Sequence, residues 1–169
     1  MTAPVSTDLI KQLRELTGAG VMDCKRALEE AGGDLAQAQK IIERQGIARA
    51  EKRAGREARQ GVIEAYVHQG RIGAMVEVNC ETDFVARTDD FRQLARHIAQ
   101  QIASMSPKYL SRDEMPADSD EDPAQVALLE QPFIRDPSKT IGQLVTEVSA
   151  RTGEKVAVRR FVRYELGKD

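Results

Sequence analysis

Apolar residues recur at every second position in one stretch near the middle of the chain. The positions are Ile72, Ala74, Val76, Val78 and Cys80. This period of two is typical of a β-strand with one buried face. A second run, residues 62–68, precedes it and is separated from it by Gln69-Gly70. The pattern predicts two antiparallel strands, over residues 62–68 and 71–80, joined by a tight turn.

Helical periodicity dominates the first 46 residues. Apolar residues recur there three and four positions apart in three runs, which Thr17-Gly18 and Gly32-Gly33 separate. Asp34 is expected to cap the third run and Gly46 to end it. The apolar positions are Leu9, Ile10, Leu13 and Leu16, then Val21, Cys24, Ala27, Leu28 and Ala31, then Leu35, Ala38, Ile41 and Ile42. We predict a small three-helix unit.

Two further helices are predicted beyond the strands. An apolar stripe over residues 91–105 has Thr88 as a possible N-cap in front and Pro107 as a stop behind. A second stripe, residues 141–148, precedes Gly153. Each stripe has one apolar side, so we expect these helices to cover one face of the sheet.

The last apolar run predicts a third strand with one irregularity. Val156 and Val158 begin an alternation that the charged Arg160 interrupts, and a β-bulge near Arg159-Arg160 would restore its phase. The fold class is therefore α+β, with a three-stranded antiparallel sheet and helices packed on one face. The expected domains are a three-helix domain (1–46), a basic linker (47–60) and an α+β core (61–169).

Charge adds detail to this picture. The linker 47–60 holds five basic residues against Glu51 and Glu57, which is typical of a solvated connector; steering toward an acidic partner is the alternative. Residues 112–122 contain six acids and are predicted to form an exposed loop or a locally disordered segment, with a short helix after Pro123. The net charge of −2 offers no broad basic field, so no direct nucleic-acid partner is expected.

No membrane partner is expected either. The chain has no apolar run near the ~20 residues that cross a bilayer. Its start, MTAPVSTDLIKQ, lacks the charged and apolar regions of a signal peptide. We therefore expect a cytoplasmic protein.

The segment from Glu77 to Arg87, EVNCETDFVAR, places an aromatic residue after an acid where a strand gives way to a helix start. Thr82 to Val85 are expected to form a short, anchored loop. Composition alone favours Phe84 as an ordinary core residue, because Phe is among the most buried residue types. The alternative is a ring that enters another protein's surface, with Asp83 beside it to compete for polar groups there.

Four segments resemble one known family. ETDFV resembles a signature of bacterial elongation factor Ts, the guanine nucleotide exchange factor for elongation factor Tu. LRELTGAGVMDCKRAL, residues 13–28, resembles the family's other long signature. QPFIRDPSKTIGQLV, residues 131–145, and VRRFVRYELG, residues 158–167, resemble family segments in the family's order. The chain is identified as a short member of this family, because it has one ETDFV strand and no room for a second sheet subdomain.

The resemblance implies two contact surfaces for elongation factor Tu and no cofactor. The first disturbs the partner's magnesium and phosphate site, and its residues are Thr82, Asp83, Phe84 and Val85. The second lies on the amino-terminal domain, which resembles a ubiquitin-associated domain, and its residues are Arg14, Val21 and Met22. The glycines of the TGAG turn between them are equally well explained as structural. Short members also imply a homodimer in which two sheets pack together.

Two other classes of function are alternatives to the exchange factor. An enzyme could use Cys80 as nucleophile with His68 or His97 as base, or Asp83 as acid, but no phosphate-binding loop accompanies them. An RNA-binding adaptor could use the basic linker, which lacks interleaved aromatic residues. We expect no enzymatic activity. Cys24 and Cys80 lack metal-site or disulfide spacing and are expected to be buried.

Overall fold

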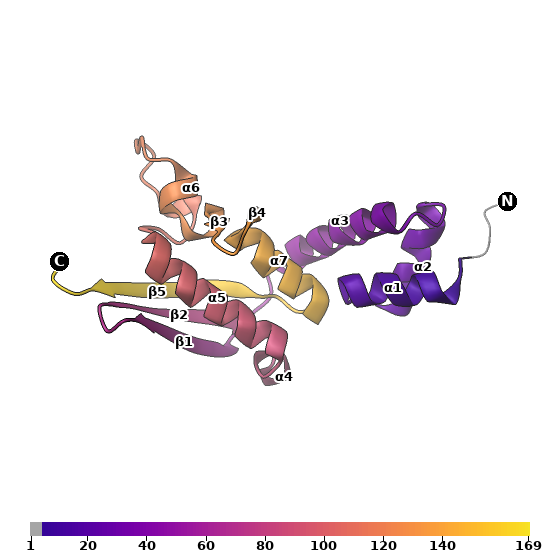
Figure 1. Ribbon diagram of the computed structural model, residues 1–169, viewed down its shortest axis with the longest axis horizontal. Helices are drawn as coiled ribbons and strands as arrows, with labels where there is room; N and C mark the ends of the chain where they lie inside the picture. The colour runs from indigo at the N-terminus through magenta and orange to yellow at the C-terminus, as the bar shows by residue number, and fades with distance from the viewer. Residues whose placement is uncertain (1–4) are drawn as a thin grey trace.

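Three helices form one end of the molecule in the computed structural model, which describes residues 5–169 (Figure 1). They are α1 (Thr7–Thr17), α2 (Val21–Glu30) and α3 (Leu35–Arg53). Ser6 caps α1 and Asp34 caps α3, each accepting a hydrogen bond from a backbone N–H in the first turn. Leu13, Leu28 and their neighbours form a small buried core. The three predicted helices are confirmed; residues 1–4 of the predicted unit lie outside the described range.

The third helix is longer than predicted. It continues to Arg53 instead of ending at Gly46, so the first half of the predicted linker 47–60 is helical. Gly46 lies where α3 crosses α7 (Ile141–Thr152). A Cβ atom at position 46 would lie 2.9 Å from Cβ of Ala150, which is too close for two carbon atoms. The glycine therefore permits a close helix crossing and does not mark a helix end.

The sheet contains β1 (Gln60–His68), β2 (Ile72–Cys80) and β5 (Ala157–Glu165), in the order β1-β2-β5, and all pairs are antiparallel. Residues 69–71 connect β1 to β2: the backbone N–H of Arg71 donates to the carbonyl of His68 at 2.9 Å, and the two residues between them, Gln69 and Gly70, have the positive φ angles of 50° and 68° that a type I′ turn requires. Glu77 pairs with Arg160 but Val78 pairs with Val158, so Arg159 is an extra residue. The predicted strands and bulge are confirmed.

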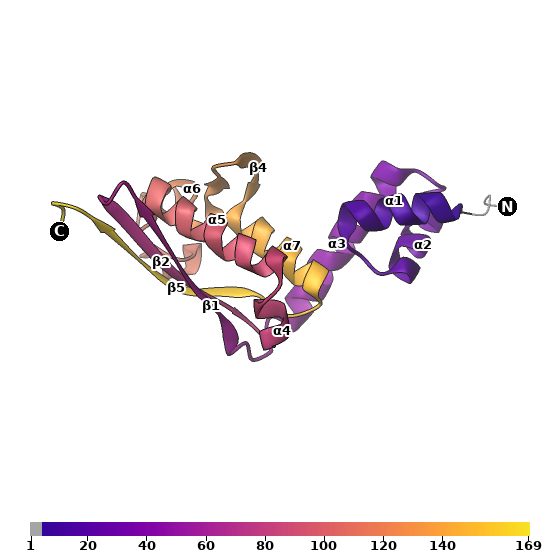
Figure 2. The same ribbon diagram turned by 60° about the horizontal axis from the view of Figure 1, so that its bottom comes forward.

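Two long helices cover one face of the sheet. Figure 2 shows α5 (Asp89–Met105) and α7 on the same side of β1, β2 and β5, with α4 (Asp83–Ala86) at the end of the sheet. Thr88 caps α5, as predicted, and Thr140 forms a capping box at the start of α7. The main core lies between these layers and includes Val76, Phe91 and Ile98. The predicted α+β class is confirmed.

Short elements connect α5 to α7. They are η1 (Arg112–Glu114), α6 (Pro123–Val126), η2 (Leu128–Glu130), β3 (Pro132–Phe133) and β4 (Asp136–Thr140). The helix after Pro123 was predicted, whereas the β3–β4 hairpin was not. Gln101 of α5 holds this hairpin, because its buried amide donates to the carbonyl of Pro132 and accepts from the backbone N–H of Ile134. That contact joins residues more than 30 positions apart, beyond any local pattern.

Candidate functional site

The Phe84 ring projects from α4, between the end of β2 and the start of α5. The segment Thr82–Val85 is a single helical turn capped by Thr82, not the predicted loop. The ring is 83% exposed, and no other large apolar side chain of residues 5–169 is exposed to that degree. The expectation from composition, a core residue, is therefore wrong for Phe84. Leaving an aromatic ring in water forgoes the stabilisation that burial provides, which points to a contact surface.

The turn that carries the ring is anchored on its inner side. Ala86 is buried, and the half-buried Val85 packs against the main core. The hydroxyl of Thr88 donates to the carbonyl of Val85 at 2.7 Å. Thr82 Oγ1 accepts from the backbone N–H of Val85 at 3.4 Å. Since Val85 and Ala86 point inward, Phe84 faces outward.

Asp83 lies beside the ring and is also exposed. Its carboxylate is 3.1 Å from the guanidinium of Arg87, one helical turn later. Both side chains are more than half exposed, so this ion pair stabilises the turn little and is screened by salt. Asp83 can therefore exchange Arg87 for another cation or donor at small cost.

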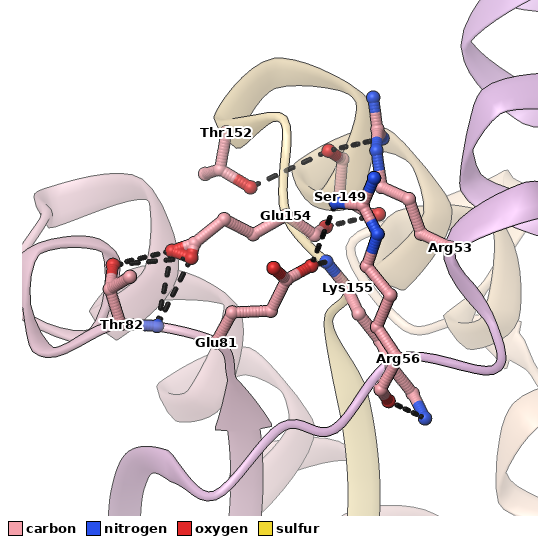
Figure 3. Close-up of polar contacts among 8 residues, drawn as sticks. All are labelled: Arg53, Arg56, Glu81, Thr82, Ser149, Thr152, Glu154 and Lys155. Atoms are coloured by element: carbon pink, nitrogen blue, oxygen red, sulfur yellow. Dashed lines mark hydrogen bonds and ion pairs between the residues drawn. The ribbon is translucent and has the colours of Figure 1, made fainter.

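Two glutamates fasten the start of this turn to the turn between α7 and β5. Figure 3 shows Glu154 facing Thr82: the Thr82 N–H donates to Glu154 at 3.1 Å, and the Thr82 hydroxyl donates to it at 2.5 Å. Glu81 accepts from the backbone N–H of Lys155 at 2.6 Å. That bond, with the guanidinium of Arg56, holds the pKa of Glu81 below its usual range. Sequence reasoning missed Glu154, because 72 residues separate it from Thr82 and no local pattern links them.

Cys80 lies just before this turn, and its thiol is unreactive. Its thiol donates to the carbonyl of Thr82 at 3.1 Å and is buried. Burial raises its pKa to about 11, with the negative charge of Glu154 adding to the effect. The residue therefore stays a protonated thiol at neutral pH, and Cys24 is buried too. The predicted burial of both cysteines is confirmed.

A second exposed surface lies at the turn between α1 and α2. Val21 is 48% and Met22 62% exposed, and Arg14 is exposed on α1. The structure thus places these three predicted residues at the surface. The helical spacing predicts Leu16 in the apolar stripe of α1, but the side chain is 55% exposed, so that prediction is wrong for Leu16. Leu16 and Ile47 instead line an open groove between the helical unit and α7.

The sheet face opposite the helices is a third exposed surface. It carries five exposed apolar side chains from all three strands: Ile63, Val67, Met75, Val162 and Tyr164. Met75 lies between Ala65 and Val162 in one cross-strand row. At one end of this face, Glu77 pairs with Arg160 at 2.7 Å and with Arg159 at 3.1 Å. An uncovered apolar sheet face of this kind usually meets a partner.

The residues considered for enzyme chemistry are not assembled. His68 pairs with Ile72, whereas Cys80 pairs with Gln60, so they lie at opposite ends of the hairpin. His97 lies on α5, and its ring packs at a tilt against Phe133 of β3, with the ring centroids 5.2 Å apart. Residues 5–169 contain no group of His, Cys, Asp or Glu arranged to hold a metal ion, and no helix in that range is long and apolar enough to span a membrane.

The family model described as elongation factor TS matches residues 5–122 and 120–168. The chain belongs to the elongation factor Ts family. The matched segments contain every predicted contact residue, from Arg14 to Val85. The resemblance drawn from the four sequence segments is therefore confirmed, and membership places the chain among the translation elongation factors.

Individual relatives agree with this assignment. Elongation factor Ts of Coprothermobacter proteolyticus is 47% identical over 195 aligned residues, which cover 97% of this chain and 99% of the relative. Elongation factor Ts of Thermotoga petrophila is 46% identical over 193 residues, covering 97% of each chain. Both alignments are longer than the 169 residues of this chain, so these elongation factor Ts proteins have residues that it lacks.

Proposed function

We propose that this chain binds elongation factor Tu in its GDP-bound state, promotes GDP release, and so allows GTP to bind. The observation that carries the proposal is the exposed ring of Phe84 on an anchored turn, within a segment that the family model matches. An exposed ring on a fixed turn is suited to enter a neighbouring surface, because little conformational freedom is lost when it binds.

The thermodynamic basis of exchange is linkage. A factor that binds the nucleotide-free partner more tightly than the GDP-bound partner must weaken GDP binding by the same ratio. It needs no covalent chemistry, and we propose that the chain has none. The site then acts in the cytoplasm, where translation takes place.

The proposed action is a displacement at the magnesium and phosphate site of elongation factor Tu. Phe84 enters between side chains of the nucleotide-binding domain, and Asp83 takes over polar contacts beside it. Phosphates held by a cation and backbone N–H groups bind less well once either is misplaced. A second contact with elongation factor Tu, made by Arg14, Val21 and Met22, adds to the affinity. Met suits such a contact because its side chain adapts to the opposing surface.

We also propose that the chain forms a homodimer through the open face of its sheet. A second copy would cover the apolar side chains of that face around a two-fold axis, each copy contributing the same residues. The central row, Ala65, Met75 and Val162, carries no charge, which suits a buried position.

The test is GDP release from elongation factor Tu, followed by stopped-flow fluorescence with labelled GDP. Phe84→Ala should keep the fold and slow the release at saturating factor by about tenfold or more, the loss of ~1.4 kcal/mol of stabilisation or more. Ile134→Ala is the control, because it removes an exposed apolar side chain from the distant β3–β4 hairpin. Undiminished GDP release with Phe84→Ala would show that the Phe84 ring does not cause the release.

A further inference from the structure

The pairing of β2 with β5 is extended by side chains after the strands end. The last backbone pair is Asn79 with Ala157. Beyond it, two bonds run in opposite directions: Glu154 accepts from the backbone N–H of Thr82, and Glu81 accepts from the backbone N–H of Lys155. Figure 3 shows this reciprocal exchange. The segment that leads into α4 is thus fixed to the α7–β5 turn at two adjacent residues.

Glu154 is an unusual member of this exchange because it is buried without a cation. It is 9% exposed, and none of the ion pairs among residues 5–169 includes it. Burying a carboxylate is costly unless hydrogen bonds compensate it. Both of its oxygens accept from Thr82, whose N–H and hydroxyl are the donors. Charge-assisted bonds of this kind are shorter and stronger than neutral ones.

The turn needs this external support because α4 is only four residues long. A helix that short is unstable by itself, since nucleation fixes several backbone angles for few hydrogen bonds. The exposed ring of Phe84 also gains little packing from its own subunit. Its direction therefore depends on the backbone at Thr82 and on the inward packing of Val85 and Ala86.

The same turn between α7 and β5 also holds the end of the helical unit. Ser149 donates through its hydroxyl to the carbonyl of Glu154 at 2.6 Å, and its own carbonyl accepts from Arg53 at 3.2 Å. The Lys155 ammonium donates to the carbonyl of Arg56 at 2.8 Å. The base of the Phe84 turn, the end of α3 and the residues just after α3 are thus attached to one short segment, residues 149–155.

We propose that Glu154 is a positioning residue for nucleotide exchange: by holding Thr82, it sets the direction in which α4 presents Phe84. The inference rests on the proposed function, since it names a residue that acts through Phe84. Glu154 itself is buried behind the turn and acts through its hydrogen bonds to Thr82. Its loss leaves Phe84 in place but free to point in several directions, so each encounter is less productive.

The test compares Glu154→Ala, Glu154→Gln and Phe84→Ala, alone and combined, in the GDP-release assay over a range of factor concentrations. We expect Glu154→Ala to lower the maximal rate about fivefold, with the half-saturating concentration unchanged within about twofold, because the α1–α2 surface still supplies affinity. Glu154→Gln should lower the maximal rate less, since glutamine keeps a hydrogen-bond acceptor but loses the charge. Combined with Phe84→Ala, neither change should slow release further, because the two residues act as a unit.

Glu147→Ala is the matched control. Glu147 lies on α7 and pairs with Lys139 and Arg151, so its removal perturbs the same helix without touching Thr82. Its maximal rate should equal that of the wild type. Amide hydrogen exchange of Thr82, followed by NMR, should accelerate in both Glu154 variants and not in Glu147→Ala.

The outcomes separate the two proposals. If Phe84→Ala slows release but both Glu154 variants match the wild type, or if their effects add fully to that of Phe84→Ala, the positioning role is overturned and the exchange function stands. If Phe84→Ala has no effect on GDP release, the proposed role of the Phe84 ring is overturned, and the positioning role of Glu154 is overturned with it. Should Glu154→Ala not fold, Glu154→Gln decides alone, and a wild-type maximal rate for it overturns the inference.

Discussion

Phe84 and Phe91 are seven residues apart, yet one is 83% exposed and the other is fully buried. In a continuous helix, two residues seven positions apart would lie on nearly the same face. The helix is instead interrupted, because α4 ends at Ala86 and Thr88 begins α5 with a new cap. The interruption turns the first ring outward while the second stays in the core.

Met22 is expected to contribute to the affinity for elongation factor Tu and not to the maximal rate of GDP release. Met22→Ala should weaken binding to elongation factor Tu by about tenfold, or ~1–2 kcal/mol, because an exposed anchor side chain is lost. The maximal rate of GDP release at saturation should be retained, since Phe84 is intact. Titration calorimetry measures the affinity. Met105→Ala, which removes another exposed methionine, is the control; equal affinities for the two variants would contradict the prediction.

Asp23 provides a prediction about pH. Hydrogen bonds to Arg49 on α3, at 2.9 and 3.1 Å, lower the pKa of Asp23 to about 2, and Arg26 adds to the effect. A carboxyl group whose pKa is depressed on folding stabilises the protein above its unfolded pKa, and that stabilisation is lost as pH falls toward its folded pKa. The contribution is about 1–2 kcal/mol once solvent screening at the half-exposed Arg49 is considered.

Asp23→Asn should therefore lower the urea midpoint at pH 7, and the difference from the wild type should shrink by roughly half at pH 3. Urea titrations of both proteins at the two pH values measure this. A difference that stays constant with pH would show that the carboxylate charge is not the cause.

At the scale of elements, α3 joins the three-helix unit to α7 through packed contacts, which a solvated linker would not provide. Its first half belongs to the three-helix unit and its second half crosses α7 at Gly46. Arg49, assigned from sequence to a solvated connector, instead ties α3 to α2 through Asp23. One continuous helix thus connects the α1–α2 surface with the elements that hold the Phe84 turn (Figure 1).

Gly46→Ala tests this crossing. The new methyl group would meet Cβ of Ala150, and such overpacking costs about 1–3 kcal/mol. Alanine in place of glycine inside a helix recovers about 1 kcal/mol. We expect a net destabilisation of about 1 kcal/mol in thermal or urea unfolding. Ala150→Gly combined with Gly46→Ala removes the clash, so the double variant should lose less than the sum of the single losses; strict additivity would contradict the crossing.

At the scale of the whole molecule, the contact surfaces lie on different parts of an elongated chain. The helical unit with Met22 is at one end, and α4 lies near the junction of the helices with the sheet (Figure 2). The open sheet face is on the side away from α5 and α7. A dimer through that face would use a different part of the molecule from the two surfaces proposed for elongation factor Tu.

Met75→Lys tests the proposed dimer, because it places a charge in the centre of the apolar sheet face. A buried charge without a partner is costly, so the variant should sediment as a monomer of 18.7 kDa at micromolar concentration while the wild type sediments at twice that mass. Gln93→Lys, on the exposed side of α5, is the control and should not change the mass. A monomeric wild type would rule the dimer out.

Local patterns predicted most of the elements. The alternation ending at Cys80 specified β2, the misplaced Arg160 specified the bulge in β5, and Thr88 specified the start of α5. The family could also be read from four segments of sequence. Periodicity and capping act over a few residues, which is why the chain alone determined these features.

Tertiary structure decided what depends on distant segments. Gly46 sits inside a helix because α7 crosses there, and Gln101 is buried because the β3–β4 hairpin needs its amide. Phe84 is exposed because Val85 and Ala86 occupy the inner side of the same turn, and Glu154 meets Thr82 across 72 residues. Such contacts form only when the packed layers bring remote segments together, so no spacing along the chain could predict them.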